Sequence, residues 1–300
     1  MKIDKQNGNV AFSENSHTYW NVDDNEKYIS VTTLIGRYEN EFDKDFWSAY
    51  KALERLIPAE SWKIEKKSLL NTRKFDKEIL NVYDISELDF NKAQQGILDE
   101  WQYENKVSCD RGTKIHAQLE KSMYEAGANV SLKKFGLGGS FVCDKGRTSL
   151  DLENGVYPEY LISRISPDGV LRLAGQIDLL VKKGNKIWII DWKTNKKIEK
   201  NSFFDSKSRK STKMKYPLNN IEDCNFWHYT LQLSTYAWMI EKLNPDFEIQ
   251  GLIMVHYDHN NKQTVYHLEY LKDDVEKMLK HYKKELLHNK RLMKYKKIEY

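Results

Sequence analysis

The stretch "GQIDLLVKKGNKIWIIDWK", residues 175–193, constrains the fold more than any other part of the chain. Two runs rich in Leu, Val and Ile flank a Gly-Asn pair, which is the pattern of a β-hairpin with a two-residue turn. Asp178 interrupts the first run, and Asp191 and Lys193 end the second. Charges beside a core persist when they are paired, hydrogen-bonded or bound to metal. The two strands should therefore belong to a buried sheet that carries a polar site.

The turn sets the pairing of these two strands. With the Gly-Asn pair at the tip, Asp178 falls directly opposite Asp191, and Gln176 falls opposite Lys193. Directly opposed residues have Cβ atoms ~5 Å apart. Residues two apart on a strand point to the same face. Asp178, Asp191 and Lys193 should therefore converge.

An upstream turn, "SPDG", extends this face to a third strand. If Pro167 and Asp168 form its centre, Glu159 lies opposite Gln176. Like charges that face one another across strands repel. Carboxylates gathered in this way can instead bind a divalent cation together, and hard oxygen ligands favour Mg²⁺ or Mn²⁺. The alternative is that Asp191 only ends a strand and Lys193 is solvated. The polar face would contain Glu159, Gln176, Asp178, Asp191 and Lys193.

The remaining patterns predict an α/β chain with a helical elaboration near its N-terminus. Residues 1–105 should form a small β-hairpin, a helix near Ser30 and further helices, and residues 106–300 an α/β core that ends in a basic helix. The two parts together should make one compact unit. Elements expected beyond the hairpin are a helix running through "SCDRGTKIHAQLEKSMYEAG", a helix "FWHYTLQLSTYAWMIEKLN", and a strand pair "EIQGLIMVHY" and "TVYHLEYL".

Composition excludes several classes of protein. The chain has 300 residues, of which 40% are hydrophobic, and a formal charge of +4. Its three cysteines show no CxxC spacing, which disfavours a zinc or iron–sulfur site and favours a reducing compartment. The N-terminus lacks the apolar core of a signal peptide, and no apolar run approaches the ~18 residues of a membrane span. These features predict a cytoplasmic protein with no membrane partner.

Four short motifs, in order, resemble the PD-(D/E)XK nuclease superfamily, most closely its RecB-like and phage-exonuclease-like branch. "GQID" resembles the G-x-x-D motif and "DWK" the D-x-K motif. "RGTKIHAQLE" resembles an upstream helix motif, and "LQLSTYAWMIE" resembles the Q-x-x-x-Y motif. The resemblance covers roughly residues 110–245. It implies a restriction-endonuclease-like core, in which helices flank a central mixed β-sheet.

The resemblance also implies roles for individual residues. Asp178 and Asp191 would be the principal metal ligands, and His116 an added one. Lys193 would be the catalytic lysine, and Glu159 a supporting acidic residue. Two residues would lie beside the site and position DNA or the lysine: Gln232 and Tyr236. The four-cysteine iron–sulfur cluster of some relatives is not expected here.

Several of these residues have plainer interpretations. His116 could make a core contact while Glu120, on the same helical face, is solvated, and Gln232 and Tyr236 could belong to an amphipathic core helix. The Lys-rich stretch 196–215, with Phe203 and Phe204, could grip phosphates and unstacked bases or be a solvated loop. The basic run from Lys283 to Lys297 has the same two interpretations.

The expected function is that of a metal-dependent DNA nuclease, an exonuclease by preference, in recombination, repair or replication. Its partners would be DNA and a recombination or replication protein, in a bacterial host cell and encoded by a phage. One rival is a non-catalytic DNA-binding subunit with a vestigial site, which the set Asp178, Asp191 and Lys193 disfavours. Another is a metal-dependent hydrolase with a different substrate, which the basic loop disfavours.

Overall fold

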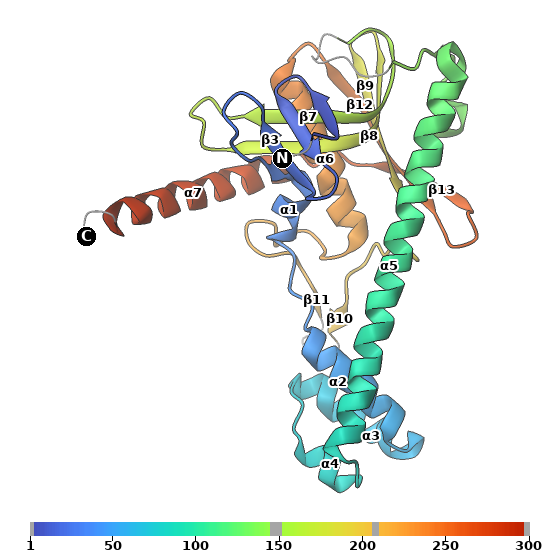
Figure 1. Ribbon diagram of the computed structural model, residues 1–300, viewed down its shortest axis with the longest axis vertical. Helices are drawn as coiled ribbons and strands as arrows, with labels where there is room; N and C mark the ends of the chain where they lie inside the picture. Colours follow the sequence, from blue (N-terminus) through green and yellow to red (C-terminus); the bar gives the residue numbers. More distant parts are fainter. Residues whose placement is uncertain (1–2, 145–151, 206–209, 297–300) are drawn as a thin grey trace. The chain divides into compact units, whose positions relative to one another are not determined.

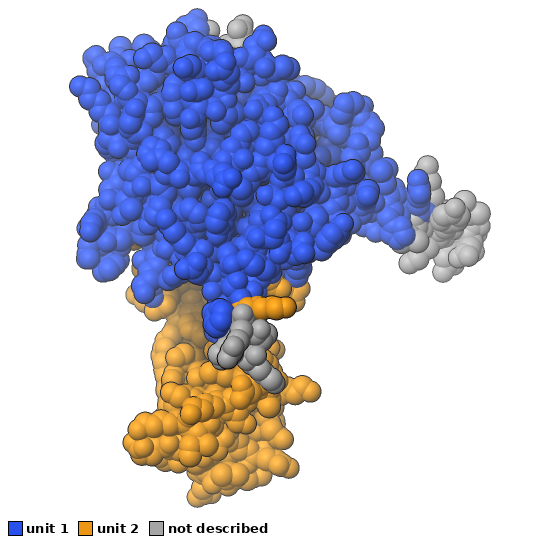
Figure 2. Space-filling view, turned by 180° about the vertical axis from the view of Figure 1, so that it is seen from behind, with its two compact units in different colours: residues 1–39, 114–204, 211–300 blue, residues 40–113, 205–210 orange. Residues whose placement is uncertain are grey.

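Figure 1 shows the computed structural model of the chain, which describes residues 3–144, 152–205 and 210–296. Two compact units are present, coloured separately in Figure 2. Unit 2 comprises residues 40–113 and 205–210, and unit 1 the rest of the chain. The N-terminal residues 1–39 lie in the same unit as the main sheet, and the division into residues 1–105 and 106–300 stays a prediction.

A six-stranded mixed sheet forms the centre of unit 1. Its order is β13-β12-β9-β8-β4, and β7 pairs with β8. β12 runs parallel to β9 and β4 parallel to β8, whereas the other neighbours are antiparallel. The strands are β4 (Ile29–Ser30), β7 (Gly155–Ile165), β8 (Arg172–Lys183), β9 (Lys186–Lys193), β12 (Glu248–Tyr257) and β13 (Gln263–Leu268).

The register of the β8–β9 hairpin confirms the one predicted from its turn. The ladder runs from Lys183 opposite Lys186 to Leu179 opposite Ile190. The ladder ends one position before Asp178 and Asp191, the pair that the same register would align next. A two-residue Gly-Asn turn leaves no freedom in the pairing of its flanking strands, which explains this agreement.

The predicted register of the β7–β8 turn was wrong. Gln176 pairs with Leu161, not with Glu159. The turn is longer than expected, because the amide of Gly169 bonds to the Ser166 carbonyl and Gly169 adopts a left-handed φ of 68°. The centre of the turn therefore lies one residue further along the chain than predicted. As a result, the partner of every residue on these two strands shifts by two positions.

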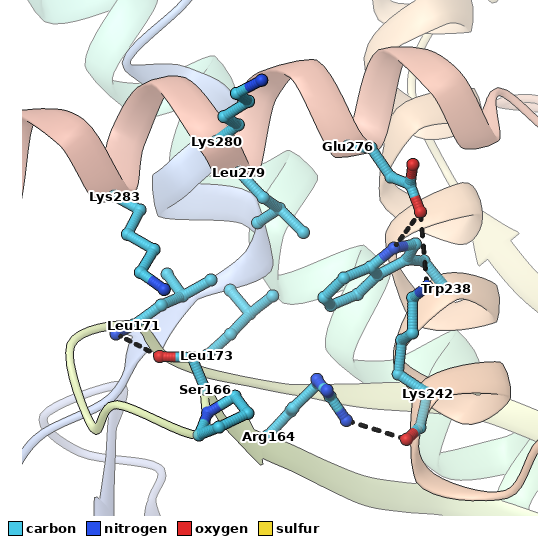
Figure 3. Close-up of a pocket in the computed structure, with 11 residues that line it drawn as sticks. Arg164, Ser166, Leu171, Leu173, Trp238, Lys242, Glu276, Leu279, Lys280 and Lys283 are labelled. Atoms are coloured by element: carbon cyan, nitrogen blue, oxygen red, sulfur yellow. Dashed lines mark hydrogen bonds and ion pairs between the residues drawn. The ribbon is translucent and has the colours of Figure 1, made fainter.

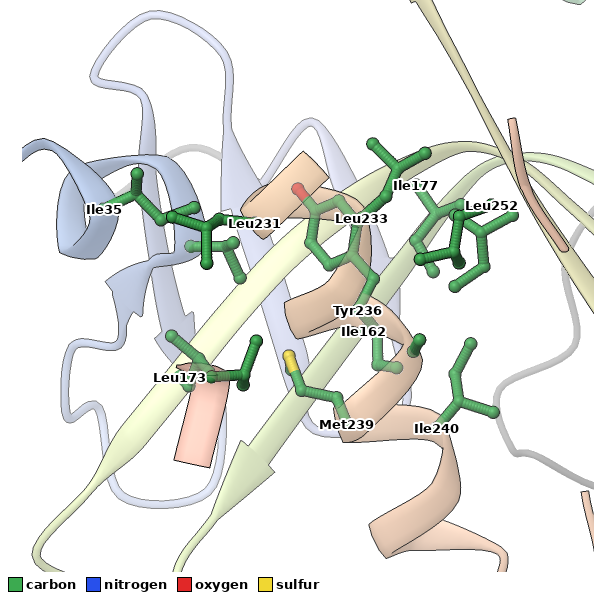
Figure 4. Packing of buried hydrophobic residues seen from close by; sticks show 14 of the residues in the cluster. Ile35, Ile162, Leu173, Ile177, Leu231, Leu233, Tyr236, Met239, Ile240 and Leu252 are labelled. Carbon is green, nitrogen blue, oxygen red and sulfur yellow. The ribbon is translucent and has the colours of Figure 1, made fainter. Parts of the chain in front are cut away.

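Helices cover both faces of this sheet, as the predicted fold class requires. On one face α6 (Asn225–Leu243) packs with α1 (Val31–Gly36) and α7 (Lys272–Lys296) over a large apolar core, part of which is shown in Figure 4. On the other face, the C-terminal end of α5 (Glu87–Ala126) and residues 130–141 bury Leu179, Ile190 and Trp192. The mixed sheet with flanking helices is the restriction-endonuclease-like arrangement that the motifs implied.

The N-terminal residues form a small antiparallel sheet that packs beside the main one. Its strands β1 (Lys5–Asn7), β2 (Val10–Ser13) and β3 (Thr18–Asn21) bury aromatic side chains against Leu161 and Ala174. Ser30 then caps α1 by accepting a hydrogen bond from the Thr33 amide. The predicted hairpin that feeds a helix near Ser30 is thus confirmed.

Unit 2 is helical and has a core of its own. α2 (Lys44–Leu56), α3 (Ala59–Thr72), α4 (Glu78–Val82) and the first part of α5 bury Phe46, Leu53, Trp62 and Phe90. None of the described helices is both long and apolar enough to cross a membrane. The short pairs elsewhere are β5 (Val130–Ser131) with β6 (Ser140–Phe141) and β10 (Phe204–Asp205) with β11 (Lys210–Ser211).

Candidate active site

The site lies where β8 and β9 cease to pair. The ladder of paired residues ends at Leu179 and Ile190. One oxygen of Asp178, Oδ2, accepts a hydrogen bond from the backbone amide of Trp192 at 2.7 Å. This bond replaces a missing ladder bond, so the carboxylate of Asp178 is held by the neighbouring strand where the ladder ends.

Glu159 enters the site from β7 through an unusual backbone conformation. Its φ is +53°, which a residue other than glycine rarely adopts, and the β7–β8 register places it opposite Asp178. On β7, Tyr157 and Tyr160 both pack into the same apolar core although they are three residues apart. The alternation of the strand therefore changes sides at Glu159. Backbone outliers of this kind cluster at functional sites.

Two polar neighbours hold the Glu159 carboxylate in place. Gln176 donates a hydrogen bond to its Oε2 from the adjacent strand, although the two residues are not directly opposed. Lys5 of β1 places its Nζ 3.1 Å from the same oxygen. The N-terminal sheet thus contributes a cation to the site, which the sequence patterns did not indicate.

His116 reaches the carboxylates from α5. Its Nδ1 lies 3.6 Å from Asp178 Oδ2 and 3.9 Å from Glu159 Oε1. Its Nε2 lies 3.1 Å from the backbone carbonyl of Trp192. A carbonyl can only accept, so Nε2 carries a proton and Nδ1 faces the carboxylates. Metal-binding histidines are oriented in this way by a bond from the second ring nitrogen.

The donor set fits a small divalent cation. Ligand atoms of His116, Glu159 and Asp178 all lie within 4.8 Å of one another. Ligands of one Mg²⁺ at its usual bond length of ~2.1 Å lie within ~4 Å of one another, so modest side-chain movement would close the set. This trio contains Glu159, which was expected only in a supporting role, in place of the expected Asp191.

Asp191 is 2% exposed, and its contact is with Lys193. The ammonium lies 2.7 Å from Asp191 Oδ2. This contact is an ion pair, and Lys193 is the one residue that the described part of the chain places against this buried oxygen. A buried carboxylate oxygen held only by charge remains able to accept a further cationic ligand.

Lys193 is held on three sides. Besides the ion pair with Asp191, its ammonium donates to Gln232 Oε1 at 3.2 Å and lies 4.4 Å from the centre of the Tyr229 ring. Such a cation–aromatic contact is worth more when it is shielded from water. The lysine is therefore preorganised beside the carboxylates, not free at the surface.

α6 supplies the residues behind this lysine. Gln232 donates from Nε2 to the hydroxyl of Tyr236 at 3.3 Å, and both residues are buried. The Tyr236 ring lies directly over Gly175 in β8, the first residue of "GQID". The structure thus brings Gln232 within contact of Lys193, and Tyr236 contacts Gln232, not Lys193.

The mutual fields of these groups shift their pKa values. Burial, and then the charge of Asp191, raise the pKa of Asp178 to about 7. Burial alone would lower the pKa of His116, but Glu159 and Asp178 outweigh it and raise that pKa to about 9. Burial likewise acts to lower the pKa of Lys193, and Asp191 and Asp178 reverse the direction, so its pKa is raised. Lys193 is therefore a charged group and not a proton acceptor.

Other residues near the site carried no sequence signal. Lys5, Tyr19 and Tyr229 reach it through tertiary contacts alone; burial and then the charges of Glu159 and Asp178 raise the pKa of Tyr19 strongly. Glu120 was noted for its position four residues after His116. Burial and then the charge of Glu159 raise the pKa of Glu120.

The basic stretch 196–215 is only partly described. Lys207 and Arg209 lie outside the described residues. Lys213 forms an ion pair with Glu222, which reduces the charge it can offer to a phosphate. Phe203 and Phe204 are more than half exposed. The solvated and DNA-gripping interpretations of this stretch both remain predictions.

A model of the PD-(D/E)XK nuclease superfamily matches residues 124–299 of the chain. Among curated proteins, none matches. Two solved structures are distantly similar. One is SSO0001, with 17% sequence identity and a TM-score of 0.25, and the match covers 41% of this chain and 46% of that protein. The other is a protein from Eubacterium rectale named a "putative exonuclease", with 12% identity and a TM-score of 0.31, and the match covers 87% of this chain and 80% of that protein. The chain thus aligns with less than half the length of the first.

Proposed function

Because the chain belongs to the PD-(D/E)XK nuclease superfamily, we propose that it hydrolyses the phosphodiester bonds of DNA with Mg²⁺ or Mn²⁺ as its cofactor. The observation that carries this proposal is the convergence of His116, Glu159 and Asp178 beside the Asp191–Lys193 ion pair. Two carboxylates and one imidazole whose ligand atoms lie within 4.8 Å of one another suit a hard divalent cation.

His116, Glu159 and Asp178 would hold the metal, and Asp191 would complete its ligands. When bound, a divalent metal neutralises phosphate charge and lowers the pKa of a water molecule. Lys193 would place a fixed positive charge beside the scissile phosphate, where negative charge develops in the transition state. Gln232 would act as a positioning residue, since its Oε1 orients the ammonium, and Tyr236 would in turn hold Gln232.

We further infer an exonuclease of the RecB-like, phage-exonuclease-like branch that acts in recombination, repair or replication. The order of the "RGTKIH", "GQID", "DWK" and "QLSTY" motifs supports this branch. A digestion time course tests the mode of action with end-labelled linear and covalently closed circular DNA, each with Mg²⁺ or Mn²⁺. We expect the linear DNA to be degraded and the circle to persist.

The Asp178→Asn variant is the matched control for that time course. It keeps the size of the side chain and removes its charge, so cleavage should be lost. Cleavage of the circle would replace the exonuclease assignment by an endonuclease one. If the wild type binds DNA but leaves both substrates intact with either metal, the protein is a non-catalytic DNA-binding subunit.

A further inference from the structure

A cavity opens in unit 1, and none of the candidate active-site residues lines it. It has a volume of about 310 Å³ and lies between the β7–β8 turn, the end of α6 and the middle of α7 (Figure 3). Leu171, Leu173 and Leu279 converge beneath α7, with Trp238 beside them. Cavities of ~300 Å³ or more with apolar walls and a few polar groups are typical of ligand sites.

The rim of this cavity is basic. Four cationic residues line it, against the single carboxylate of Glu276: Arg164, Lys242, Lys280 and Lys283. Lys242 lies 3.4 Å from Glu276, and Lys283 lies 2.6 Å from Asp168 of the adjacent turn. Lys280 is exposed and has no ion-pair partner among the residues that the structure describes. Positive charge therefore exceeds negative charge around the opening.

The polar atoms inside the cavity already bond to one another. Arg164 donates to the Lys242 carbonyl at 2.9 Å, and its guanidinium lies 5.3 Å from the centre of the Trp238 ring. The indole N–H of Trp238 donates to Glu276 at 3.2 Å, and Ser166 Oγ accepts from the Leu171 amide at 3.0 Å. A nucleobase would bring polar edges that find few free partners here, which is costly. An apolar side chain needs none.

We propose that this cavity binds an acidic peptide segment of a partner protein. A bulky apolar side chain of the peptide would fill the space between Leu171, Leu279 and Trp238, and flanking carboxylates would face Lys280 and Lys283. Charge complementarity at a rim mainly sets partner choice and association rate, whereas the buried apolar group holds the complex. This binding site is separate from the nuclease site and does not depend on the function proposed for it.

A synthetic probe tests the proposal with the full-length protein. The probe is a fluorescein-labelled peptide of six Asp and Glu residues followed by two Phe residues, titrated with anisotropy detection. We expect saturable binding that Lys280→Glu weakens about tenfold or more, because the reversed charge repels the peptide. Asp168→Asn should strengthen binding, because it keeps the oxygen that caps the turn and releases Lys283 from its ion pair.

Matched controls separate this site from general attraction to a basic surface. Lys290→Glu makes the same charge change on exposed α7, ~15 Å along the helix. That distance exceeds the Debye length of ~8 Å at physiological salt, so binding should hardly change. A probe with Ser in place of both Phe residues should bind at least about tenfold more weakly, because it loses the buried apolar group.

Three outcomes would overturn the proposal. One is equal weakening by Lys280→Glu and Lys290→Glu. Another is that a short single-stranded DNA displaces the probe and that Lys280→Glu weakens binding of this DNA as much as it weakens binding of the probe. The cavity would then bind nucleic acid. The third is a change in oligomeric state of Lys280→Glu in sedimentation, since a second copy of the chain would then occupy the cavity.

Discussion

The ring of Tyr236 lies where a β-carbon on residue 175 would have to be. A methyl group built on Gly175 would lie 2.5 Å from Cε1 and 2.9 Å from the hydroxyl oxygen of that ring. Tyr236 accepts a hydrogen bond from Gln232, and Gln232 accepts one from Lys193. The glycine that opens "GQID" therefore permits the close packing that places the lysine.

Gly175→Ala should displace the Tyr236 ring and lower stability by about 1–3 kcal/mol, the usual cost of overpacking a core. The shift should reach Lys193 through Gln232 and reduce the single-turnover cleavage rate. Urea denaturation and single-turnover kinetics measure the two effects. Gly138→Ala is the control, because no atom lies within 4 Å of the place its methyl group would take, and it should be close to neutral. If Gly175→Ala leaves the free energy of unfolding unchanged, the packing argument is wrong.

The metal ligands can be distinguished by their effect on Mn²⁺ binding. Asp178→Asn and Asp191→Asn should each abolish cleavage and weaken Mn²⁺ binding, and Glu159→Gln should weaken binding by about 10–100-fold or more. DNA binding without metal should survive, because loss of a carboxylate removes repulsion toward phosphate. Isothermal calorimetry makes the measurement. Unchanged Mn²⁺ affinity in both aspartate variants would refute the site assignment.

Metal binding should strengthen as the pH rises. A metal ligand must give up its proton, and the metal-free protein holds protons on Asp178 below a pKa of about 7 and on His116 below about 9. A metal must displace both protons below about pH 7 and neither above about pH 9. Apparent Mn²⁺ affinity should therefore rise across this window, by up to about tenfold per pH unit for each displaced proton.

Calorimetry in two buffers of different ionisation enthalpy counts the protons released. His116→Asn should release fewer protons near neutral pH than the wild type, because the imidazolium is no longer present. Equal proton release by both proteins would mean that His116 does not become a ligand.

Lys193→Met tests the lysine as a group that stabilises the transition state. Metal and DNA affinity should stay near those of the wild type, and the single-turnover rate should fall by about 10²–10³. Lys193→Arg should not restore the rate, because a planar guanidinium cannot fit the contacts with Asp191, Gln232 and Tyr229.

Lys186→Met is the matched control for that substitution, since Lys186 is an exposed lysine at the opposite end of β9. It should cleave at the wild-type rate. If Lys193→Met does the same, the ion pair with Asp191 has only a structural role.

Gln232→Ala should slow cleavage less than Lys193→Met does, by about tenfold, because the ammonium keeps its ion pair with Asp191. In the double variant with Lys193→Met the two effects should not add, because Gln232 acts through the lysine. Additive effects, measured as single-turnover rates, would show that Gln232 acts on the substrate directly.

Local chemistry made part of the site predictable. A Gly-Asn turn between two apolar runs favours one register, and the predicted register is confirmed as far as Leu179 and Ile190, one position before Asp178 and Asp191. The β7–β8 turn has no such restriction. The loop holds residues 167–170, two residues more than predicted, with Gly169 in a left-handed conformation, and the predicted pairing of Glu159 failed by two positions. Register errors of this kind arise wherever turn length is set by backbone conformation and not by residue type.

The sequence by itself determined the hairpin, its polar face, the helices that flank the sheet and the motifs that identify the family. Only the tertiary structure decided that Lys5 reaches Glu159 from a strand more than 150 positions away, and that Glu159 joins His116 and Asp178 while Asp191 pairs with Lys193. The physical reason is that β-pairing and turns act between near neighbours. Which carboxylate meets which cation depends on packing between distant elements and on a single left-handed residue, Glu159, that turns β7 over.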